Sequence, residues 1–316
     1  MKVGLALPHY DFSFPSGDFS FPSEQHATVR RVLEYALRAE ELGFDSVWVS
    51  DHLFLDLAKY GGPPQRYKTP EATAMLAALA AGTSRVRFGS LVLCASFRHP
   101  VFLAAQLQTL LEMSNGRLEV GLGAGWYEAE FNAAGIPFGT AAQRIERLAV
   151  VAGQLDARLE PRPPIIVGGK GGPKLARVVA EHADAWNVCW RITPDEYRAR
   201  LETLHQACAR AKRDPQTVGL SVGLYTLLGT DGNDLEARYE ALQRWTPGGA
   251  LDGVPLARFA DGALVGTVED CAATIKEFEA LGVSEIILSP ASLPFSVYDD
   301  DQLEQAARQL IPQVQG

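Results

Sequence analysis

Two patterns of apolar and polar positions alternate along the chain. Short runs rich in Val, Ile and Leu, closed by Gly or Pro, predict buried strands, and longer stretches with apolar residues three and four apart predict helices. The strand and helix patterns pair as 3–8 with 24–42, 45–50 with 69–82, 86–94 with 100–113, 117–123 with 139–157, 164–168 with 172–182, 185–188 with 194–212, 218–229 with 268–281, and 284–290 with 299–311. Eight strand–helix pairs in strict alternation predict an α/β fold, a (β/α)8 TIM barrel. The alternative, a doubly wound open sheet, usually shows fewer pairs and a GxGxxG motif after its first strand, which this chain lacks.

Residues at the predicted helix ends support this register. Gly43 and Gly282 each end a helical pattern just before a strand, as C-terminal glycine stops do. Thr193 and Pro194 fit an N-cap with Pro at the first helical position, and Thr267 precedes acids that suit a first turn. We therefore expect a single domain over residues 1–316.

Two segments are too long to be simple connectors. Residues 10–23 contain the sequence DFSFPSG followed by DFSFPS, a loop duplication whose phenylalanines predict an aromatic flap at the C-terminal mouth of the barrel. Residues 231–266 combine a short charged helix at about 234–244 with a Gly- and Pro-rich run. Loops of this length often act as lids or binding elements, so we expect a function for both.

Charge and composition narrow the functions that the chain can perform. The net charge is −9, from 38 acidic and 29 basic residues, which disfavours a nucleic-acid binder because phosphate contacts need a basic face. No window approaches the roughly 18 apolar residues of a membrane span, and the first residues predict a strand and not a signal peptide. The four cysteines form no CxxC pair and no metal-ligand cluster is visible, so we expect a cytoplasmic protein with reduced thiols and no metal.

Glycines dominate the end of the fourth predicted strand. Gly121, Gly123 and Gly125 occupy alternate positions and leave one face of the strand end without side chains. A flat ligand can lie against such bare backbone. The other interpretation is that the glycines only accommodate a tight turn, and their spacing favours neither.

Polar candidates follow other strand ends, where barrel enzymes carry their catalytic residues. His52 ends the second strand, where a histidine can donate to a ligand or move a proton near neutral pH, or can be purely structural. The adjacent Asp51 faces the other way on an extended chain, so the two do not form a relay by themselves. Arg98 suits an anion or a surface carboxylate, Glu128 suits general acid–base work, and Glu130 suits the same work or a brace for its loop.

The fifth strand runs into a glycine-rich turn that opens a helix. Gly168, Gly169 and Gly171 would present backbone N–H groups and the positive helix end to a phosphate, and Lys170 and Lys174 add charge. The spacing matches neither the Walker nor the dinucleotide motif, and a tight turn is the alternative. The residues by themselves therefore predict a barrel enzyme that binds a flat, phosphate-bearing ligand.

Several motifs occur in a fixed order along nearly the whole chain. They are Ser50-Asp-His52, the strand 89–100 ending in Phe-Arg-His-Pro, Ser-Asn-Gly-Arg at 114–117, Gly-Leu-Gly-Ala-Gly-Trp at 121–126, Gly-Ile-Pro-Phe at 135–138, Val-Gly-Gly at 167–169 and Ala-Asp-Ala-Trp-Asn at 183–187. In this order they resemble the motifs of the bacterial luciferase-like flavin and deazaflavin enzymes. The resemblance is greatest to the F420-dependent oxidoreductase branch, and it implies a (β/α)8 barrel that binds coenzyme F420, or alternatively FMN, at its mouth.

The resemblance also implies roles for individual residues. His52 would lie beside the cofactor ring as the catalytic group, and the backbone at Leu91 and Val92 would form a bulge, often with a non-prolyl cis peptide, behind the ring. The remaining cofactor contacts would be Asp51, Gly123, Ala124 and Gly125 near the ring, and Gly168, Gly169, Lys170 and Gly171 at its phosphate.

Two departures from the family pattern bear on the substrate. Only residues 158–163 separate the fourth helix from the fifth strand, where relatives carry a longer loop, so a wall of the site is expected to be missing or replaced by the Phe-rich repeat. In the deazaflavin sugar-phosphate dehydrogenases an acid follows the strand-four glycines. Here Trp126 takes that place, which argues against a sugar-phosphate substrate.

The expected reaction is hydride transfer between C5 of the deazaflavin and a carbon of a small organic substrate, with His52 assisting proton movement. The first alternative is an FMN-dependent monooxygenase that receives reduced flavin from a partner reductase. The second is a non-catalytic flavin- or deazaflavin-binding barrel, made possible by the short loop. The resemblance implies a homodimer by default.

Overall fold

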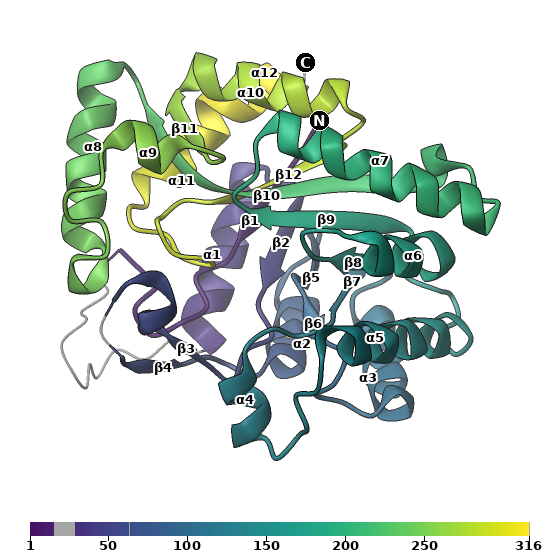
Figure 1. Ribbon diagram of the computed structural model, residues 1–316. Helices are drawn as coiled ribbons and strands as arrows, with labels where there is room; N and C mark the ends of the chain where they lie inside the picture. Colours follow the sequence, from purple (N-terminus) through teal and green to yellow (C-terminus); the bar gives the residue numbers. More distant parts are fainter. Residues whose placement is uncertain (16–28, 63, 316) are drawn as a thin grey trace.

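The chain folds into a closed barrel of parallel strands surrounded by helices (Figure 1). This computed structural model describes residues 1–15, 29–62 and 64–315. Around the barrel, β1 pairs with β2, followed by β5, β7, β8, β9, β10 and β12, and β12 pairs with β1 to close the ring. These strands span Lys2–Ala6, Ser46–Val49, Arg87–Ser90, Leu118–Gly123, Ile165–Gly168, Ala185–Trp190, Gly219–Gly229 and Glu285–Ser289. The predicted (β/α)8 barrel is confirmed, strand for strand.

Helices run back along the outside of the barrel between successive strands. They are α1 (Val29–Leu42), α2 (Ala72–Gly82), α3 (Pro100–Met113), α5 (Ala141–Asp156), α6 (Pro173–His182), α7 (Pro194–Ala211) and α10 (Val268–Ala280), followed by α11 (Asp301–Gln305), a π-helical segment (Ala306–Leu310) and α12 (Ile311–Gln315). The N-caps predicted at Thr193 and Thr267 are confirmed, and each forms a full capping box with the third helical residue. The glycine stops are also confirmed, since Gly43 and Gly282 have φ of 86° and 89°. The predicted start of the first helix, before Val29, lies outside the described residues.

Several short elements have no clear counterpart in the hydrophobic pattern. They are the hairpin strands β3 (Phe54–Asp56) and β4 (Arg66–Lys68), β6 (Leu93–Cys94), α4 (Glu128–Ala133), α9 (Leu256–Ala260) and β11 (Leu264–Thr267). The predicted helix at 234–244 is α8, which spans Gly232–Trp245. A helix of less than two turns, or a strand of two to four residues, is too short to show a recognisable hydrophobic pattern. Contacts with the barrel therefore determine the structure of these elements. The hairpin and α4 lie together at one end of the barrel (Figure 1).

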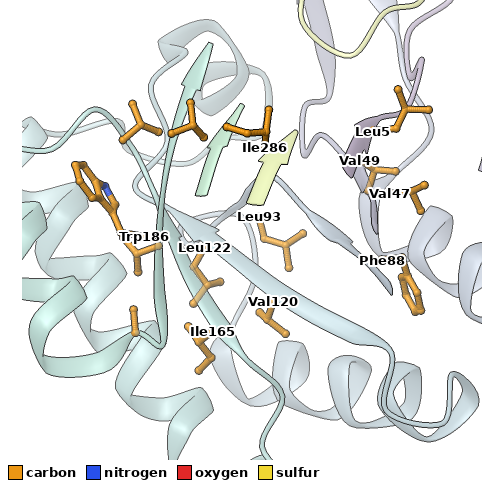
Figure 2. Close-up of a cluster of buried hydrophobic side chains, with 14 of the residues drawn as sticks. Leu5, Val47, Val49, Phe88, Leu93, Val120, Leu122, Ile165, Trp186 and Ile286 are labelled. Atoms are coloured by element: carbon orange, nitrogen blue, oxygen red, sulfur yellow. The ribbon is translucent and has the colours of Figure 1, made fainter. Parts of the chain in front are cut away.

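The barrel strands are buried on both faces. Their outer faces carry aliphatic side chains that pack under the helices, among them Leu5, Val47 and Val120 (Figure 2). Inside the barrel, Trp48 needs glycine neighbours, because a Cβ at Gly89 would lie 2.8 Å from its ring. The interior is therefore a packed core, and chemistry is confined to the C-terminal strand ends, which we call the mouth.

An ionic group fills the other end of the barrel interior. Arg87 forms ion pairs with Glu119 and Glu285, and the Ser46 hydroxyl donates to Glu285 at 2.6 Å. Burial raises the pKa of Glu119, an effect that the charge of Arg87 opposes. These charged groups bind one another at the N-terminal ends of the strands, so they take no part in a site at the mouth.

The described part of the first excursion belongs to the core. Tyr10, Phe12 and Phe14 are fully buried, with Phe12 stacked on Tyr10 at 5.6 Å and edge-on to Tyr67 at 5.0 Å. The carbonyl of Phe14 accepts a hydrogen bond from the Trp245 indole at 3.2 Å. The prediction of an aromatic flap is therefore wrong for this half of the repeat, because its rings are enclosed by neighbouring segments. Residues 16–23, with the second copy, lie outside the described residues.

The short connection at 158–163 lies away from the mouth. It leads from the end of α5 to the start of β8, and in a barrel such helix-to-strand connections lie at the N-terminal ends of the strands. The expectation that its shortness removes a wall of the site is therefore wrong. None of the described helices combines the length and apolar character needed to cross a membrane.

Candidate active site

A histidine and a glutamate from different elements meet at the mouth. His52 follows β2, and its Nδ1 lies 2.8 Å from Oε2 of Glu130 in α4. The other carboxylate oxygen of Glu130 accepts the N–H groups of Leu53 at 2.5 Å and Phe54 at 3.3 Å. Because a carboxylate accepts hydrogen bonds, the pair places a proton on Nδ1 of His52 and leaves Nε2 to exchange protons.

The structure decides between the acidic candidates that the sequence left open. Glu130 is 2% exposed and is the partner of His52, so it braces its loop and also orients the histidine. Glu128 lies in the first turn of α4 with its side chain exposed. The rings of Tyr10 and Trp126 flank His52, with centroids at 6.4 Å and 5.8 Å. His52 is therefore held by one buried carboxylate and two aromatic rings.

Asp51 points to the other side of the chain, as the sequence predicts, and binds Arg98. The guanidinium donates to both carboxylate oxygens, at 2.6 Å and 2.8 Å, and the Cys94 N–H donates to Oδ2 at 2.8 Å. Arg98 also pairs with Glu71. Burial lowers the pKa of Arg98, but its hydrogen bonds to Asp51 and Glu71 and the charges of these carboxylates outweigh burial and raise the pKa above its ordinary value. Arg98 thus binds carboxylates, and Asp51 holds the end of β6 through the Cys94 N–H. The contact of Asp51 with a cofactor stays a prediction.

The backbone between β5 and β6 forms the predicted bulge, and the Leu91–Val92 peptide is cis. The Val92 side chain packs against two glycines of neighbouring strands. A Cβ at Gly123 would lie 2.4 Å from one Val92 methyl, and a Cβ at Gly168 would lie 2.6 Å from the other. The side-chain space that Gly123 and Gly168 leave is thus occupied by Val92, and a flat ligand at this strand end stays a prediction.

Gly125 has a different reason to be glycine. Its φ is 78°, and a Cβ there would lie 2.7 Å from both the Cys94 sulfur and the Phe131 ring. Its carbonyl accepts a hydrogen bond from Arg144 at 3.1 Å. With Ala124, it directs the chain from β7 out to Trp126. Contacts of residues 123–125 with a cofactor stay a prediction.

The glycine-rich segment after β8 adopts backbone conformations that favour glycine, while its contact with a phosphate stays a prediction. Gly169 and Gly171 have positive φ of 148° and 92°. The Gly169 carbonyl accepts the Trp186 indole N–H at 3.0 Å, and the Lys170 carbonyl accepts a hydrogen bond from Arg200. The following helix, α6, has Gly172 as N-cap and no side-chain cap hydrogen bond. The hydrogen bonds from Trp186 and Arg200 therefore fix this segment, and no side chain accepts a hydrogen bond from the backbone N–H groups at the N-terminus of α6.

A second histidine at the mouth, His9, was missed by sequence reasoning. It lies beyond β1, is fully buried, and its Nδ1 is 2.9 Å from the Ser50 hydroxyl. Burial, reinforced by the nearby charge of His52, lowers the pKa of His9 to about 3. In the sequence, a role for His9 at the mouth is indicated only by its position directly after the first predicted strand. His9 is therefore neutral over the working pH range.

The buried His9 predicts a pH-dependent stability. Its pKa is about 3 in the folded chain against about 6.5 when unfolded. The unfolded state therefore binds the extra proton between these values, and stability falls as the pH drops from about 6.5 towards 3. One such group contributes about 1.4 kcal/mol per pH unit to the free energy of unfolding. Urea titrations between pH 6 and pH 4 should show a slope that is smaller by about this amount in His9→Gln.

The matched control is His205→Gln, because His205 is an exposed histidine on α7. Its slope should equal that of the parent protein. An unchanged slope in His9→Gln would contradict the assignment of a neutral, buried His9.

A mouth that carries an oriented histidine on a (β/α)8 barrel is the arrangement of a barrel enzyme. A family profile described as luciferase-like monooxygenase matches residues 11–285. The chain belongs to this family and is an oxidoreductase, which confirms the resemblance found in the sequence.

The chain is similar to individual F420-dependent enzymes and, among solved structures, also to monooxygenases, such as monooxygenase RslO1 from Streptomyces bottropensis, which superposes with a TM-score of 0.73 at 23% identity over 99% of each chain. The chain is 30% identical over 263 residues to an F420-dependent hydroxymycolic acid dehydrogenase of Mycobacterium tuberculosis (strain ATCC 25618 / H37Rv), covering 73% of this chain and 68% of the relative. It is 45% identical over 97 residues to an F420-dependent glucose-6-phosphate dehydrogenase of Amycolatopsis mediterranei (strain U-32), a match that spans 30% of this chain and only 27% of that relative. A solved F420-dependent secondary alcohol dehydrogenase, in complex with an F420-acetone adduct, superposes with a TM-score of 0.74 at 20% identity, over 99% of this chain and 98% of that one. At that identity the superposition shows the fold.

Proposed function

We propose that this protein is an F420-dependent oxidoreductase that transfers a hydride between the deazaflavin and a carbon of a small organic substrate. The observation that carries the proposal is the His52–Glu130 pair, with Nδ1 and Oε2 2.8 Å apart at the mouth of the barrel. The names of both sequence relatives, each an F420-dependent dehydrogenase, support the choice of cofactor.

The residues around the mouth suit such a cofactor. The uncapped N-terminus of α6, with Lys170 and Lys174 beside it, offers N–H donors and positive charge to the phosphate. Val92, seated on Gly123 and Gly168, gives the flat ring a firm apolar support. When bound, the deazaflavin supplies a carbon, C5, that accepts or releases a hydride.

The protein itself would move the proton. Nε2 of His52 accepts the hydroxyl proton as an alcohol is oxidised, or returns it as a carbonyl is reduced. Glu130 stabilises the resulting imidazolium, since it is buried and fixed by two backbone N–H groups. The Tyr10 and Trp126 rings limit the movement of the imidazole.

The alternatives from the sequence now have different support. The family includes monooxygenases by name, so an FMN-dependent monooxygenase stays the competing function. The short connection that suggested a non-catalytic barrel lies away from the mouth, so it gives no reason to expect a loss of activity. A homodimer, a partner reductase and a cytoplasmic location stay predictions.

Titration of the purified protein with F420 and with FMN, followed by cofactor fluorescence, tests the proposal. We expect a dissociation constant for F420 in the micromolar range or tighter, about −8 kcal/mol, and weaker binding of FMN. Replacing both Lys170 and Lys174 with alanine should weaken F420 binding at least tenfold, because even one charge-assisted hydrogen bond contributes about 1.5 kcal/mol or more.

Lys276→Ala on α10 is the matched control, since this exposed lysine is outside the site, and it should bind F420 like the parent protein. Tighter binding of FMN than of F420 would favour the monooxygenase. Binding of neither cofactor would overturn the proposal.

A further inference from the structure

Two polar side-chain atoms at the mouth are fully buried and have no hydrogen-bond partner among the described residues. They are the hydroxyl of Tyr10 and Nε2 of His9, in two residues that are both 0% exposed. The Tyr10 ring lies beside His52, with ring centroids 6.4 Å apart. Burying a polar group without a hydrogen bond is unfavourable, so each of these atoms needs a physical explanation.

Packing explains the ring of Tyr10 but not its hydroxyl. The ring stacks on Phe12 with an interplanar angle of 4°, and it flanks His52. A phenylalanine would keep both contacts without the cost of removing a hydroxyl from water. An unfavourable group that is kept beside a candidate catalytic residue is typical of a functional role.

The surroundings of the Tyr10 hydroxyl place it at the mouth. Burial raises its pKa well above the ordinary value, and the Ser50 hydroxyl opposes this effect. The charges of Tyr60, Glu130 and Asp51, all at the mouth, raise the pKa further. Tyr10 therefore stays protonated over the working pH range and is a hydrogen-bond donor.

The Ser50 hydroxyl connects Tyr10 with the other unpartnered residue. It lies 2.9 Å from Nδ1 of His9, and it also acts on the pKa of Tyr10. Since His9 is neutral over the working pH range, the three residues form an uncharged polar run. This run leads from the barrel interior to the hydroxyl beside His52.

An unpartnered hydroxyl by itself does not indicate a function. Tyr197 on α7 is also fully buried with an unpartnered hydroxyl. Its ring packs against Trp186 and Phe278 in the outer core, between the strands and the helices. Tyr10 differs because it lies next to the proton-exchanging His52.

We propose that the Tyr10 hydroxyl donates a hydrogen bond to the substrate atom that exchanges a proton with Nε2 of His52. This inference rests on the proposed F420-dependent function and adds a residue to its substrate contacts. Tyr10 keeps its own proton, and its hydrogen bond stabilises the negative charge that develops on the substrate atom in the transition state. Because the hydroxyl is enclosed, a substrate reaches it only when covering side chains move. The half-buried Tyr60, on the 3-10 turn of the hairpin, is placed to do so.

Tyr10→Phe tests this inference because it removes only the hydroxyl. For a substrate found in a panel of alcohols and carbonyl compounds, we expect kcat/KM with F420 to fall at least about tenfold, mainly through kcat. The pH dependence of kcat/KM should keep its parental midpoint, because His52 still exchanges the proton. The urea midpoint should equal or exceed the parental one, because the variant loses a buried group without a partner.

Tyr197→Phe is the matched control, since it removes a hydroxyl that is equally buried and unpartnered. Its urea midpoint should change in the same direction, while kcat/KM stays parental. A parental kcat/KM in Tyr10→Phe, or a urea midpoint clearly below the parental one, would overturn the inference and leave the proposed function standing. If the parent protein binds F420 but turns over no compound of the panel, the proposed hydride transfer and this inference both fall, and only the cofactor assignment stands. Failure of the parent protein to bind F420 would overturn all three.

Discussion

Replacing His52 with alanine is expected to lower kcat by about 100- to 10,000-fold, the range that a positioned general acid–base contributes. The reason is geometric: Glu130 holds Nδ1, so Nε2 is the nitrogen available for proton exchange, and no other described side chain shares this carboxylate. Because the phosphate contacts proposed here lie at the N-terminus of α6 and the ring support lies at Val92, the F420 dissociation constant should change less than about fivefold. Turnover of a substrate found in a panel of alcohols and carbonyl compounds, and fluorescence titration of F420, measure the two effects separately.

His52→Gln tests whether the loss of kcat in His52→Ala comes from a loss of structure. The glutamine amide can still donate to Glu130, but it does not exchange protons near neutral pH, so we expect it to lose kcat as alanine does. His205→Gln, on the exposed face of α7, serves as the control for histidine loss. If His52→Gln retained more than a tenth of the parental kcat, His52 would be a structural histidine and the proton path would lie elsewhere.

The second large effect concerns Gly121. A Cβ at this position would lie 1.9 Å from the carbonyl oxygen of Ser90 and 3.0 Å from the Val92 side chain. A contact with backbone cannot be relieved by rotating a side chain, so β5 and β7 would have to separate next to the bulge. Overpacking typically costs 1–3 kcal/mol and occasionally more. We expect Gly121→Ala to lose about 3 kcal/mol or more of unfolding free energy in urea titrations, or to fail to accumulate as soluble protein.

Gly232→Ala is the matched glycine control. Gly232 is the first residue of α8, and a Cβ there has no atom within 4 Å. Its unfolding free energy should stay within about 0.5 kcal/mol of the parent protein. Equal urea midpoints for the two variants would show that β5 and β7 can separate without penalty, contrary to the close approach described here.

The candidate site illustrates which relationships a sequence can supply. His52 could be predicted because a strand end in a barrel always points to the same face, whatever the loops do. Its partner could not, since Glu130 lies in the one-and-a-half-turn helix α4, 78 residues further along, and only folding brings the two together. His9 was missed for a related reason: its role depends on burial and on Ser50, which its own sequence neighbourhood does not show.

The strand-end glycines Gly121, Gly123 and Gly125 show what residue spacing alone does not predict. Their alternate positions correctly indicated a strand end without side chains, but not what occupies the vacated space. Val92 fills it from the bulge between β5 and β6, so the contact depends on the path of that bulge. The place of the short 158–163 connection followed from topology, because helix-to-strand connections in a barrel lie opposite the mouth.

The sequence by itself determined the order of strands and helices, the closure of the barrel, the helix caps and the position of His52, because hydrophobic periodicity and capping act over a few neighbouring residues. The tertiary structure alone decided that Glu130 and not Asp51 orients His52, that Arg98 is committed to carboxylates, and that Trp126 stands exposed at the edge of the site. These features join residues from different strands and loops. Their distances are set by how the strands pack around the barrel, which no local pattern records.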